Sequence, residues 1–284
     1  MMNLSDILFV TDCDGTLLQD DKTIAPEDFA AIREFRAAGG NFVVATGRSI
    51  PTGGRLLREL DLELPSVLYN GSMLYDSRAE KILWMTEIPA EARFLVREAL
   101  NRFSGTVGSE LLTPEGLRVI AMNELVNAHL NGAVSIPHTE ASWEDLLDAH
   151  WLKVMFAMPE EQLPEFSAFL RGFSAKGVRF VRAERLFFEI LPADASKGGA
   201  LKRLCDMEGL DLSRTVALGD CDNDVEMLQE ARVGIAVSNA FPELKAAADL
   251  VTVSNEEHAV SVVLRELMKD PEGFFNRYGK ECAK

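Results

Sequence analysis

The segment Ile7-Leu8-Phe9-Val10-Thr11-Asp12-Cys13-Asp14-Gly15-Thr16 decides the fold class of this chain. Its first four residues are all apolar, which is typical of a strand buried on both faces of a parallel sheet. Two carboxylates, Asp12 and Asp14, follow where the strand gives way to a loop. Because ligands of open α/β sheets bind at the carboxyl ends of the strands, the segment predicts such a sheet with a polar site at the end of its first strand.

Strand and helix patterns alternate before and after a different middle region. Pro26 opens a helix that ends at Gly39-Gly40. The same rhythm predicts strands at 41–45, 66–69, 215–218 and 233–237, and helices through 55–60, 197–208, 224–231 and 256–269, with a polar tail after the last helix. This alternation is typical of a doubly wound, Rossmann-like parallel sheet. We therefore predict an α/β core formed by residues 1–82 and 190–284.

The middle region, residues 83–189, has another pattern. Amphipathic helices are predicted at 90–103 and 160–172, and strands at 105–121, 151–158 and 178–191. The chain has no internal repeat and no low-complexity linker at either end of this region. We therefore expect an α+β domain inserted into the core.

The charge balance excludes some classes of partner. Forty-five acidic residues against 29 basic ones give the 284-residue chain a net charge of −16. A nucleic acid or an anionic membrane would require a cationic surface, so neither is expected. The apolar fraction of 47% is that of a soluble globular protein, and no apolar run approaches the roughly 18 residues of a membrane span. No basic segment precedes the first apolar residues, so we expect a cytoplasmic location.

The cysteines carry no recognisable site. They show neither a CxxC pair nor the spacing of zinc ligands, and we interpret all four as thiols. They are Cys13, Cys205, Cys221 and Cys282.

Two acidic loops follow predicted strands. Asp12 and Asp14 repel each other unless a cation binds them, and a divalent cation is the usual one. Gly15 allows a sharp turn, and Thr16 can cap the turn or contact a phosphate. The second loop, Gly219-Asp220-Cys221-Asp222-Asn223-Asp224, lacks the spacing of a calcium EF-hand loop. An Asx-rich turn in the first loop and a helix N-cap cluster in the second remain open as alternatives.

Two further segments offer groups that bind anions. Thr46-Gly47-Arg48 follows the strand at 41–45, and a hydroxyl and a glycine amide there make a small anion nest. Lys197 stands at a predicted helix start, where the helix dipole disfavours a cation. Its position indicates another purpose, although exposed lysines are common.

Together, in this order, these motifs resemble those of the haloacid dehalogenase superfamily, and within it those of the Cof-type hydrolases with a type II α+β cap. The resemblance runs from Asp6 to about residue 265. Secondary matches are Asn70-Gly71-Ser72, Glu189-Ile190-Leu191-Pro192, Asn239-Ala240 and Ala248-Asp249. Cys13, Cys221 and His258 depart from the residues that many relatives have, and none of the three stands at a required position.

The resemblance implies a Mg²⁺-dependent phosphatase that acts on a small phosphorylated metabolite, such as a sugar phosphate. Asp12 would be the nucleophile and Asp14 the general acid and base. The expected metal ligands are Asp12, Asp14 (through its carbonyl), Asp220 and Asp224. The expected substrate contacts are Thr46, Gly47, Asn70, Lys197 and Asn223. The cap, 83–189, would select the substrate; Arg182, Glu184 and Arg185 are candidate contacts there, although a solvated hairpin tip is the better explanation of them.

Other functions remain open or are excluded. A phosphomutase of the same fold and a catalytically idle metal-binding regulatory protein are the alternatives. A dinucleotide-binding oxidoreductase would need GxGxxG after the first strand, where this chain has DCDGT, and a P-loop enzyme would need GxxxxGK. The sequence carries no signal for the oligomeric state.

Overall fold

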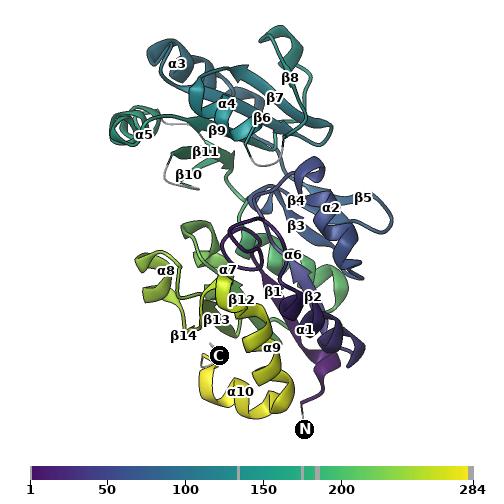
Figure 1. Ribbon diagram of the computed structural model, residues 1–284. Helices are drawn as coiled ribbons and strands as arrows, with labels where there is room; N and C mark the ends of the chain where they lie inside the picture. The colour runs from purple at the N-terminus through teal and green to yellow at the C-terminus, as the bar shows by residue number, and fades with distance from the viewer. Residues whose placement is uncertain (1, 133–134, 174–175, 183–185, 281–284) are drawn as a thin grey trace. The chain divides into compact units, whose positions relative to one another are not determined.

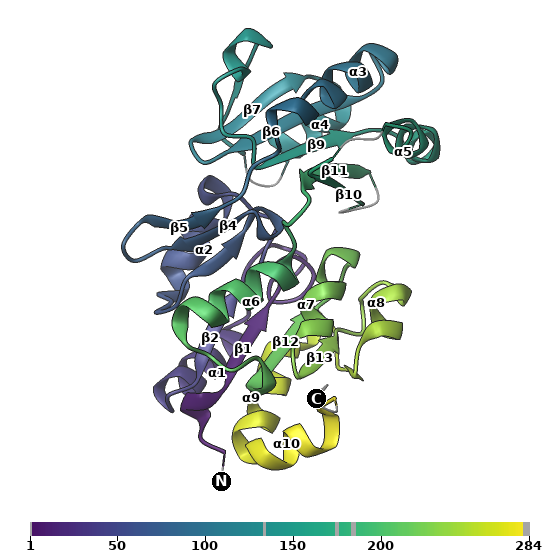
Figure 2. The same ribbon diagram turned by 180° about the vertical axis from the view of Figure 1, so that it is seen from behind.

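The computed structural model describes residues 2–132, 135–173, 176–182 and 186–280. The chain forms two compact units, which can be followed in Figures 1 and 2. The first comprises Met1–Gly47, Leu56–Leu83 and Ser196–Lys284, and the second comprises Arg48–Arg55 and Trp84–Ala195. The inserted unit therefore runs up to Ala195, immediately before the helix that carries Lys197.

A five-stranded parallel sheet forms the centre of the first unit. Its strand order is β14-β13-β12-β1-β2, and all its neighbouring pairs are parallel. The strands are β1 (Leu8–Thr11), β2 (Asn41–Val44), β12 (Thr215–Gly219), β13 (Val233–Ala236) and β14 (Leu250–Val251). Leu8 of β1 lies opposite Asn41 on one side and Thr215 on the other. All four β1 residues are buried, as expected for a strand covered on both faces.

A second, smaller sheet extends this core. It consists of β3 (Ser66–Leu68), β4 (Met73–Asp76) and β5 (Lys81–Met85). A single parallel bridge between Ala45 and Val67 connects β3 to the end of β2. This bridge places the segment that follows β3 beside the segment that follows β2.

Helices cover both faces of the parallel sheet, which confirms the predicted doubly wound fold. α1 and α9 pack against each other and lie in front of the sheet in Figure 1, whereas α6 and α7 lie in front of it in Figure 2. The helices of this unit, with α2 shared between the units, are α1 (Pro26–Ala37), α2 (Ile50–Leu60), α6 (Lys197–Glu208), α7 (Val225–Glu230), α8 (Pro242–Ala247), α9 (Ala259–Lys269) and α10 (Pro271–Tyr278).

The prediction of a polar tail after α9 is wrong, because the chain forms α10 there. Asp270 caps the helix by accepting the N–H of Gly273, and Pro271 occupies the first helical position. Phe274 and Phe275 are buried. Two adjacent aromatic side chains therefore supply the packing that stabilises this short helix.

The inserted unit is an α+β domain with a six-stranded sheet in the order β10-β11-β9-β6-β7-β8. Its neighbouring strands are antiparallel, except β7 and β8, which are parallel. Its strands are β6 (Gly108–Thr113), β7 (Gly116–Ala121), β8 (His138–Glu140), β9 (Lys153–Ala157), β10 (Val178–Arg182) and β11 (Phe187–Pro192). Its helices are α3 (Phe94–Arg102), α4 (Glu124–Leu130) and α5 (Leu163–Arg171).

Each face of this sheet buries apolar side chains of its own. Phe156 of β9 packs with residues of α3 and α5, including Phe166, in the larger cluster. The next residue, Ala157, belongs to a second cluster with Val126 of α4. Because successive residues of a strand point to opposite faces, the two clusters lie on the two sides of the sheet.

Short 3₁₀ turns connect many of these elements. They are Leu4–Asp6, Tyr69–Gly71, Ala90–Ala92, Glu144–Leu146, Glu160–Gln162, Leu212–Arg214, Asp222–Asp224 and Asn255–Glu257. Over the described part of the chain, we find no helix with the length and apolar character that crossing a membrane requires.

Candidate active site

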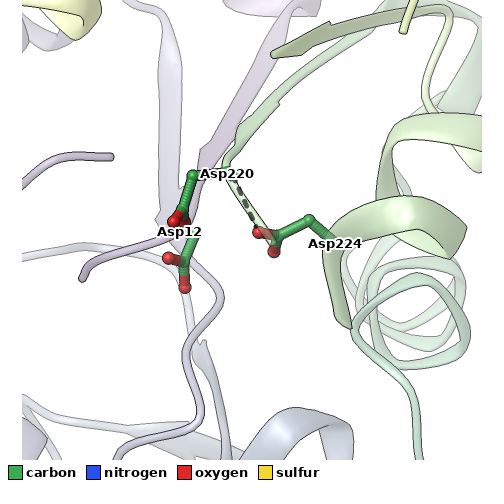
Figure 3. Close-up of side chains that lie close together, drawn as sticks. All are labelled: Asp12, Asp220 and Asp224. Atoms are coloured by element: carbon green, nitrogen blue, oxygen red, sulfur yellow. Dashed lines mark hydrogen bonds between the residues drawn. The ribbon is translucent and has the colours of Figure 1, made fainter. Parts of the chain in front are cut away.

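Asp12 and Asp220 lie at the ends of neighbouring parallel strands. Thr11, the last residue of β1, is in register with Leu218 of β12, and the Asp12 N–H donates to the Leu218 carbonyl at 2.9 Å. Each strand is followed at once by its aspartate, so the two carboxylates meet at one edge of the sheet (Figure 3). The location is the one that the first acidic segment predicts.

The turn after Asp12 fits closely against Asp220. Gly15 has φ +80°, and a Cβ atom there would lie 2.6 Å from Asp220 Oδ2. Only glycine satisfies both the left-handed conformation and this close approach. Thr16 Oγ1 donates to Asp220 Oδ1 at 3.1 Å. Thr16 therefore orients a carboxylate, a contact that the sequence does not suggest.

Lys197 reaches two carboxylates from the start of α6. Ser196 caps this helix by accepting the N–H of Gly199. The Lys197 Nζ atom donates to Asp12 Oδ1 at 2.5 Å and to Asp224 Oδ1 at 2.6 Å, and the side chain is fully buried. Burial lowers the pKa of Lys197, but the two carboxylates raise it by more, so the ammonium stays charged. These two ion pairs explain a lysine at a helix start.

Asp224 holds the second acidic loop. Its Oδ2 atom accepts the N–H of Asp220 at 3.0 Å, drawn in Figure 3, and that of Cys221 at 3.1 Å. Asp224 ends the 3₁₀ turn Asp222–Asp224 before α7 and is fully buried. Both of its oxygens thus contact the protein. The N-cap cluster left open by the sequence is present with Cys221, and not Asp222 or Asn223, at the cap position, and Asp224 also forms the ion pair with Lys197.

The cluster has an excess of negative charge. Carboxylate oxygens of Asp12, Asp220 and Asp224 lie within 4.8 Å of one another, and a single buried ammonium, that of Lys197, faces them. Burial, opposed in part by Lys197 and reinforced by Asp224 and Asp220, raises the pKa of Asp12 well above its ordinary value. Burial and then Asp224 raise the pKa of Asp220 to about 7. An all-oxygen group with two uncompensated charges fits a hard divalent cation.

A second group of predicted residues meets after β2 and β3. The Asn70 N–H donates to the Thr46 carbonyl at 3.0 Å, and Asn223 Nδ2 donates to Asn70 Oδ1 at 3.0 Å. Gly47 faces the same side chain, since a Cβ atom there would lie 2.8 Å from Asn70 Oδ1. Asn70 has φ +56°, a conformation that asparagine tolerates better than most residues. The polar loops after three strands are therefore tied together.

Asp14 is placed differently from the other predicted carboxylates. Its Oδ1 atom forms an ion pair with Lys22 Nζ at 3.1 Å, and about a third of its side chain, 35%, is exposed. The group of three close carboxylates found among the described residues does not include it. None of the sequence motifs includes Lys22, although it is the only basic residue before Arg33. That isolation among acidic residues is the signal that could have identified it.

The residues that depart from the family pattern have simple structural explanations. Cys13 is buried. Burial raises the pKa of the Cys221 thiol to about 12, so that thiol stays protonated. His258 has φ +64°, which explains why glycine suits this position. Cys282 lies outside the described residues.

Charged residues of the inserted unit form ion pairs. Arg182 pairs with Glu160 at 3.2 Å, and both side chains are exposed. Glu184 and Arg185 lie outside the described residues. Lys153 of β9 and Glu189 of β11 form a buried ion pair with an N···O distance of 2.6 Å. Desolvating both charges is costly, so loss of either partner would leave an uncompensated buried charge.

Comparisons with known proteins cover most of this chain. The family of haloacid dehalogenase-like hydrolases matches residues 9–264. An HMP-PP phosphatase of Serratia proteamaculans is 29% identical over 92% of this chain and 94% of its own length. A 5-amino-6-(5-phospho-D-ribitylamino)uracil phosphatase of Bacillus subtilis is 27% identical over 93% and 98%. A Thermotoga maritima crystal structure, 25% identical, superimposes with a TM-score of 0.78 over 92% of this chain and 97% of that one.

Proposed function

Because the chain belongs to the haloacid dehalogenase-like hydrolases and is a phosphoric monoester hydrolase, we propose that it is a Mg²⁺-dependent phosphatase of small phosphorylated metabolites. It would act through an aspartyl-phosphate on Asp12. The observation that carries the proposal is the double ion pair of Lys197 with Asp12 and Asp224, beside Asp220. This arrangement supplies a nucleophile, a fixed cation and an acidic group in one place.

In the first step, an oxygen of Asp12 attacks phosphorus and the P–O bond to the leaving group breaks. Asp14 gives a proton to the departing alkoxide, which leaves as an alcohol. Lys197 neutralises part of the charge on the phosphoryl oxygens, since its ammonium lies beside Asp12. Positioning and charge neutralisation matter most here, because the transition state is loose.

In the second step, water attacks the aspartyl-phosphate. Asp14, now a carboxylate, takes the proton of the water, and the P–O bond to Asp12 breaks. Inorganic phosphate leaves, and the Asp12 carboxylate is regenerated. Asp224 keeps Lys197 and the loop of Asp220 in place during both steps, since both its oxygens contact them.

Asp12, Asp220 and the Asp14 carbonyl are the proposed ligands of Mg²⁺. The two excess negative charges of the cluster are the reason for a divalent ion, and the oxygen-only donor set is the reason for a hard one. When bound, the ion would neutralise charge on the phosphoryl oxygens. Asp224 would stabilise the loop rather than bind the ion directly, because Lys197 and backbone amides occupy its oxygens.

The proposed substrate is a sugar phosphate or a similar phosphomonoester. The Bacillus subtilis relative is named for a substrate with a phosphorylated ribityl chain. Thr46, Gly47, Asn70 and Asn223 would bind the phosphoryl group, and the inserted unit would select the rest of the molecule. The net charge of −16 argues against a nucleic-acid substrate. The described cysteines, Cys13, Cys205 and Cys221, are free thiols, as is usual in a reducing compartment, and we propose that the enzyme acts in the cytoplasm.

A burst experiment with p-nitrophenyl phosphate and β-glycerophosphate tests the two aspartates. Asp12→Asn should form no phosphoenzyme and turn over neither substrate. Asp14→Asn should still release one equivalent of p-nitrophenolate, because this leaving group needs no proton, and then hydrolyse the phosphoenzyme slowly. Its loss of kcat should be about 10² to 10⁴ and larger for β-glycerophosphate, whose alkoxide needs the proton. Rapid mixing and intact mass measure both steps.

The same assay also distinguishes the proposed phosphatase from a phosphomutase and from an idle regulatory protein. Enzyme treated with EDTA should lose turnover and regain it with Mg²⁺, whereas full activity without metal would contradict the proposed metal site. A stable phosphoenzyme that transfers its group to a second sugar phosphate would indicate a phosphomutase. No turnover of any phosphate ester by the wild type would indicate an idle regulatory protein. A burst from Asp12→Asn would show that the nucleophile is another residue.

A further inference from the structure

The loop between Asp12 and α1 folds back as a short hairpin. Leu18 and Ile24 form an antiparallel bridge. The Gln19 N–H donates to the Thr23 carbonyl, and the Lys22 N–H donates to the Gln19 carbonyl, both at 2.9 Å. Lys22 adopts φ +68° in this turn. The tight turn directs the chain back, so that the Lys22 ammonium reaches the Asp14 carboxylate.

Side chains from a later part of the chain hold the hairpin. Asn255 Nδ2 donates to the Leu18 carbonyl at 3.0 Å, and the Asp20 N–H donates to Glu256 Oε1 at 2.7 Å. Asn239 Nδ2 donates to the Gly15 carbonyl at 2.8 Å. The backbone between Asp14 and Lys22 is therefore fixed at three points. An ion pair between two anchored segments loses less freedom on forming than one between mobile side chains.

The charges near the pair are mostly negative. Asp20 and Asp21 precede Lys22, and Glu256 contacts the hairpin. Asp21 accepts the N–H and the hydroxyl of Thr23, at 2.9 and 2.7 Å, which fixes the turn. Among these acidic groups, the one that the Lys22 ammonium contacts is Asp14, at 3.1 Å. The hairpin thus brings its single cation to the proposed acid and base.

We propose that Lys22 is a positioning residue for Asp14. Its ammonium holds the Asp14 carboxylate by one oxygen, so that the side chain is in place for both proton transfers. Lys22 itself transfers no proton and contacts no substrate. The inference rests on the proposed function, since it requires Asp14 to be the general acid and base. It also explains how the one proposed catalytic carboxylate outside the buried cluster is kept in a defined orientation without burial.

The test compares Lys22→Met and Lys22→Arg with the wild type. Lys22→Met should lower kcat for β-glycerophosphate about threefold to tenfold, the size expected for one partly exposed pair to a charged group, with KM unchanged. The release of p-nitrophenolate in the first turnover should keep its rate, and hydrolysis of the phosphoenzyme should slow. Lys22→Arg should restore most of kcat, because the guanidinium can make the same ion pair.

Lys202→Met is the matched control. Lys202 pairs with Glu230 at 2.7 Å, and the exposed fractions of the two side chains, 48% and 35%, equal those of Lys22 and Asp14. The control removes the same charge and a similar ion pair, and it should leave kcat unchanged. Asp14→Asn with and without Lys22→Met completes a double-mutant cycle. When Asp14 is already replaced by asparagine, Lys22→Met should not lower kcat further.

Several outcomes would overturn the proposal. One is a raised KM with unchanged kcat in Lys22→Met, which would mean that Lys22 binds substrate. Another is a further loss of kcat when Lys22→Met is added to Asp14→Asn. An unchanged kcat in Lys22→Met, or an equal loss in Lys202→Met, would also overturn it. Each is read while the wild type turns over p-nitrophenyl phosphate and Asp12→Asn does not. Failure of the proposed function would instead appear in those two proteins.

Discussion

Asp28 is a buried carboxyl group that the proposed chemistry does not use. It lies in the first turn of α1, and its Oδ1 atom accepts the N–H of Ser261, in the first turn of α9, at 2.6 Å. His258, at the cap of α9, makes no side-chain capping bond. One helix therefore supplies the cap of another. The Asp28 Oδ2 atom is buried with no hydrogen-bond partner among the described residues, which makes the ionised form costly.

Asp28→Asn should change how stability depends on pH. Burial raises the pKa of Asp28 to about 6, while the Ser261 amide, His258 and Arg265 lower it and Glu27 raises it. Between the unfolded value of about 3.9 and this one, the folded state binds more protons, so stability falls as pH rises. Asparagine does not ionise, so this loss of stability with rising pH is absent from the variant. The variant should gain on the order of 2 kcal/mol relative to wild type between pH 4 and pH 7, measured by urea unfolding.

Glu34→Gln, at an exposed position of the same helix, is the control and should follow the wild-type profile. Each variant is compared with the wild type at the same pH. A constant difference between Asp28→Asn and wild type from pH 4 to pH 7 would contradict the prediction.

For single residues, the sequence is enough to predict that Asp12 and Asp220 meet at one edge of the sheet. Asp12 and Asp220 directly follow apolar strands, and parallel strands bring such residues to one edge. Their proposed roles stay a prediction. Lys22 could not be paired with Asp14 in advance, because the pairing depends on a left-handed turn. Nor could Thr16, whose hydroxyl contacts an aspartate about 200 residues later.

Among the elements, the start of α6 depends on a glycine of another segment. Gly71 ends the 3₁₀ turn Tyr69–Gly71 with φ +97°. A Cβ atom there would lie 2.1 Å from the carbonyl oxygen of Ser196, the cap of α6. The next residue of that helix is Lys197, so space at Gly71 determines where the buried ammonium lies.

Gly71→Ala should therefore impair both stability and catalysis. The clash with backbone and the left-handed conformation together should cost about 2 to 4 kcal/mol of unfolding free energy. Displacement of Lys197 should lower kcat/KM for p-nitrophenyl phosphate by about tenfold or more. Urea unfolding and steady-state kinetics on the purified variant measure the two effects.

Gly209→Ala at the other end of α6 is the control. Gly209 has φ +67°, but a Cβ atom there would meet nothing within 4 Å. It should cost about 1 kcal/mol from backbone strain alone and leave kcat/KM unchanged. Equal losses of activity in the two variants would mean that strain, and not the position of α6, determines the effect.

The elements differ in how well their sequence predicts them. Helix α6 has the predicted bounds, 197–208, because a serine caps it and glycine ends it. Strand β1 is a short apolar run before an acidic loop with glycine, and its length and this boundary favour a strand over a helix. Helix α10 was missed, because its sequence is polar apart from Phe274 and Phe275, and only tertiary packing shows that these are buried.

For the whole molecule, the inserted unit has apolar clusters of its own. The members of both clusters belong to the segment Trp84–Ala195. The buried pair of Lys153 and Glu189 lies in the same segment. The acidic cluster and Lys197 belong entirely to the other unit. Such a separation is required if the first unit catalyses the reaction and the inserted unit selects the substrate, as proposed.

Replacing residues 84–195 by a short Gly/Ser bridge tests that division. The remaining unit should still hydrolyse p-nitrophenyl phosphate, because it contains every proposed catalytic residue. Its kcat/KM values for a panel of sugar phosphates should become nearly equal, whereas the intact enzyme should rank them. If the shortened protein kept the ranking of the parent, substrate selection would reside in the catalytic unit. Circular dichroism confirms that the shortened protein is folded.

The position of β1 between β2 and β12 has a consequence for biosynthesis. β2 leaves the ribosome soon after β1, but β12, which pairs with β1 from Leu8 opposite Thr215, follows much later. At about 5 to 20 residues per second, the roughly 200 intervening residues take on the order of 10 to 40 seconds to translate. During that interval β1 has one unpaired edge, which invites wrong pairing. The nascent chain must therefore be protected until its last third has emerged.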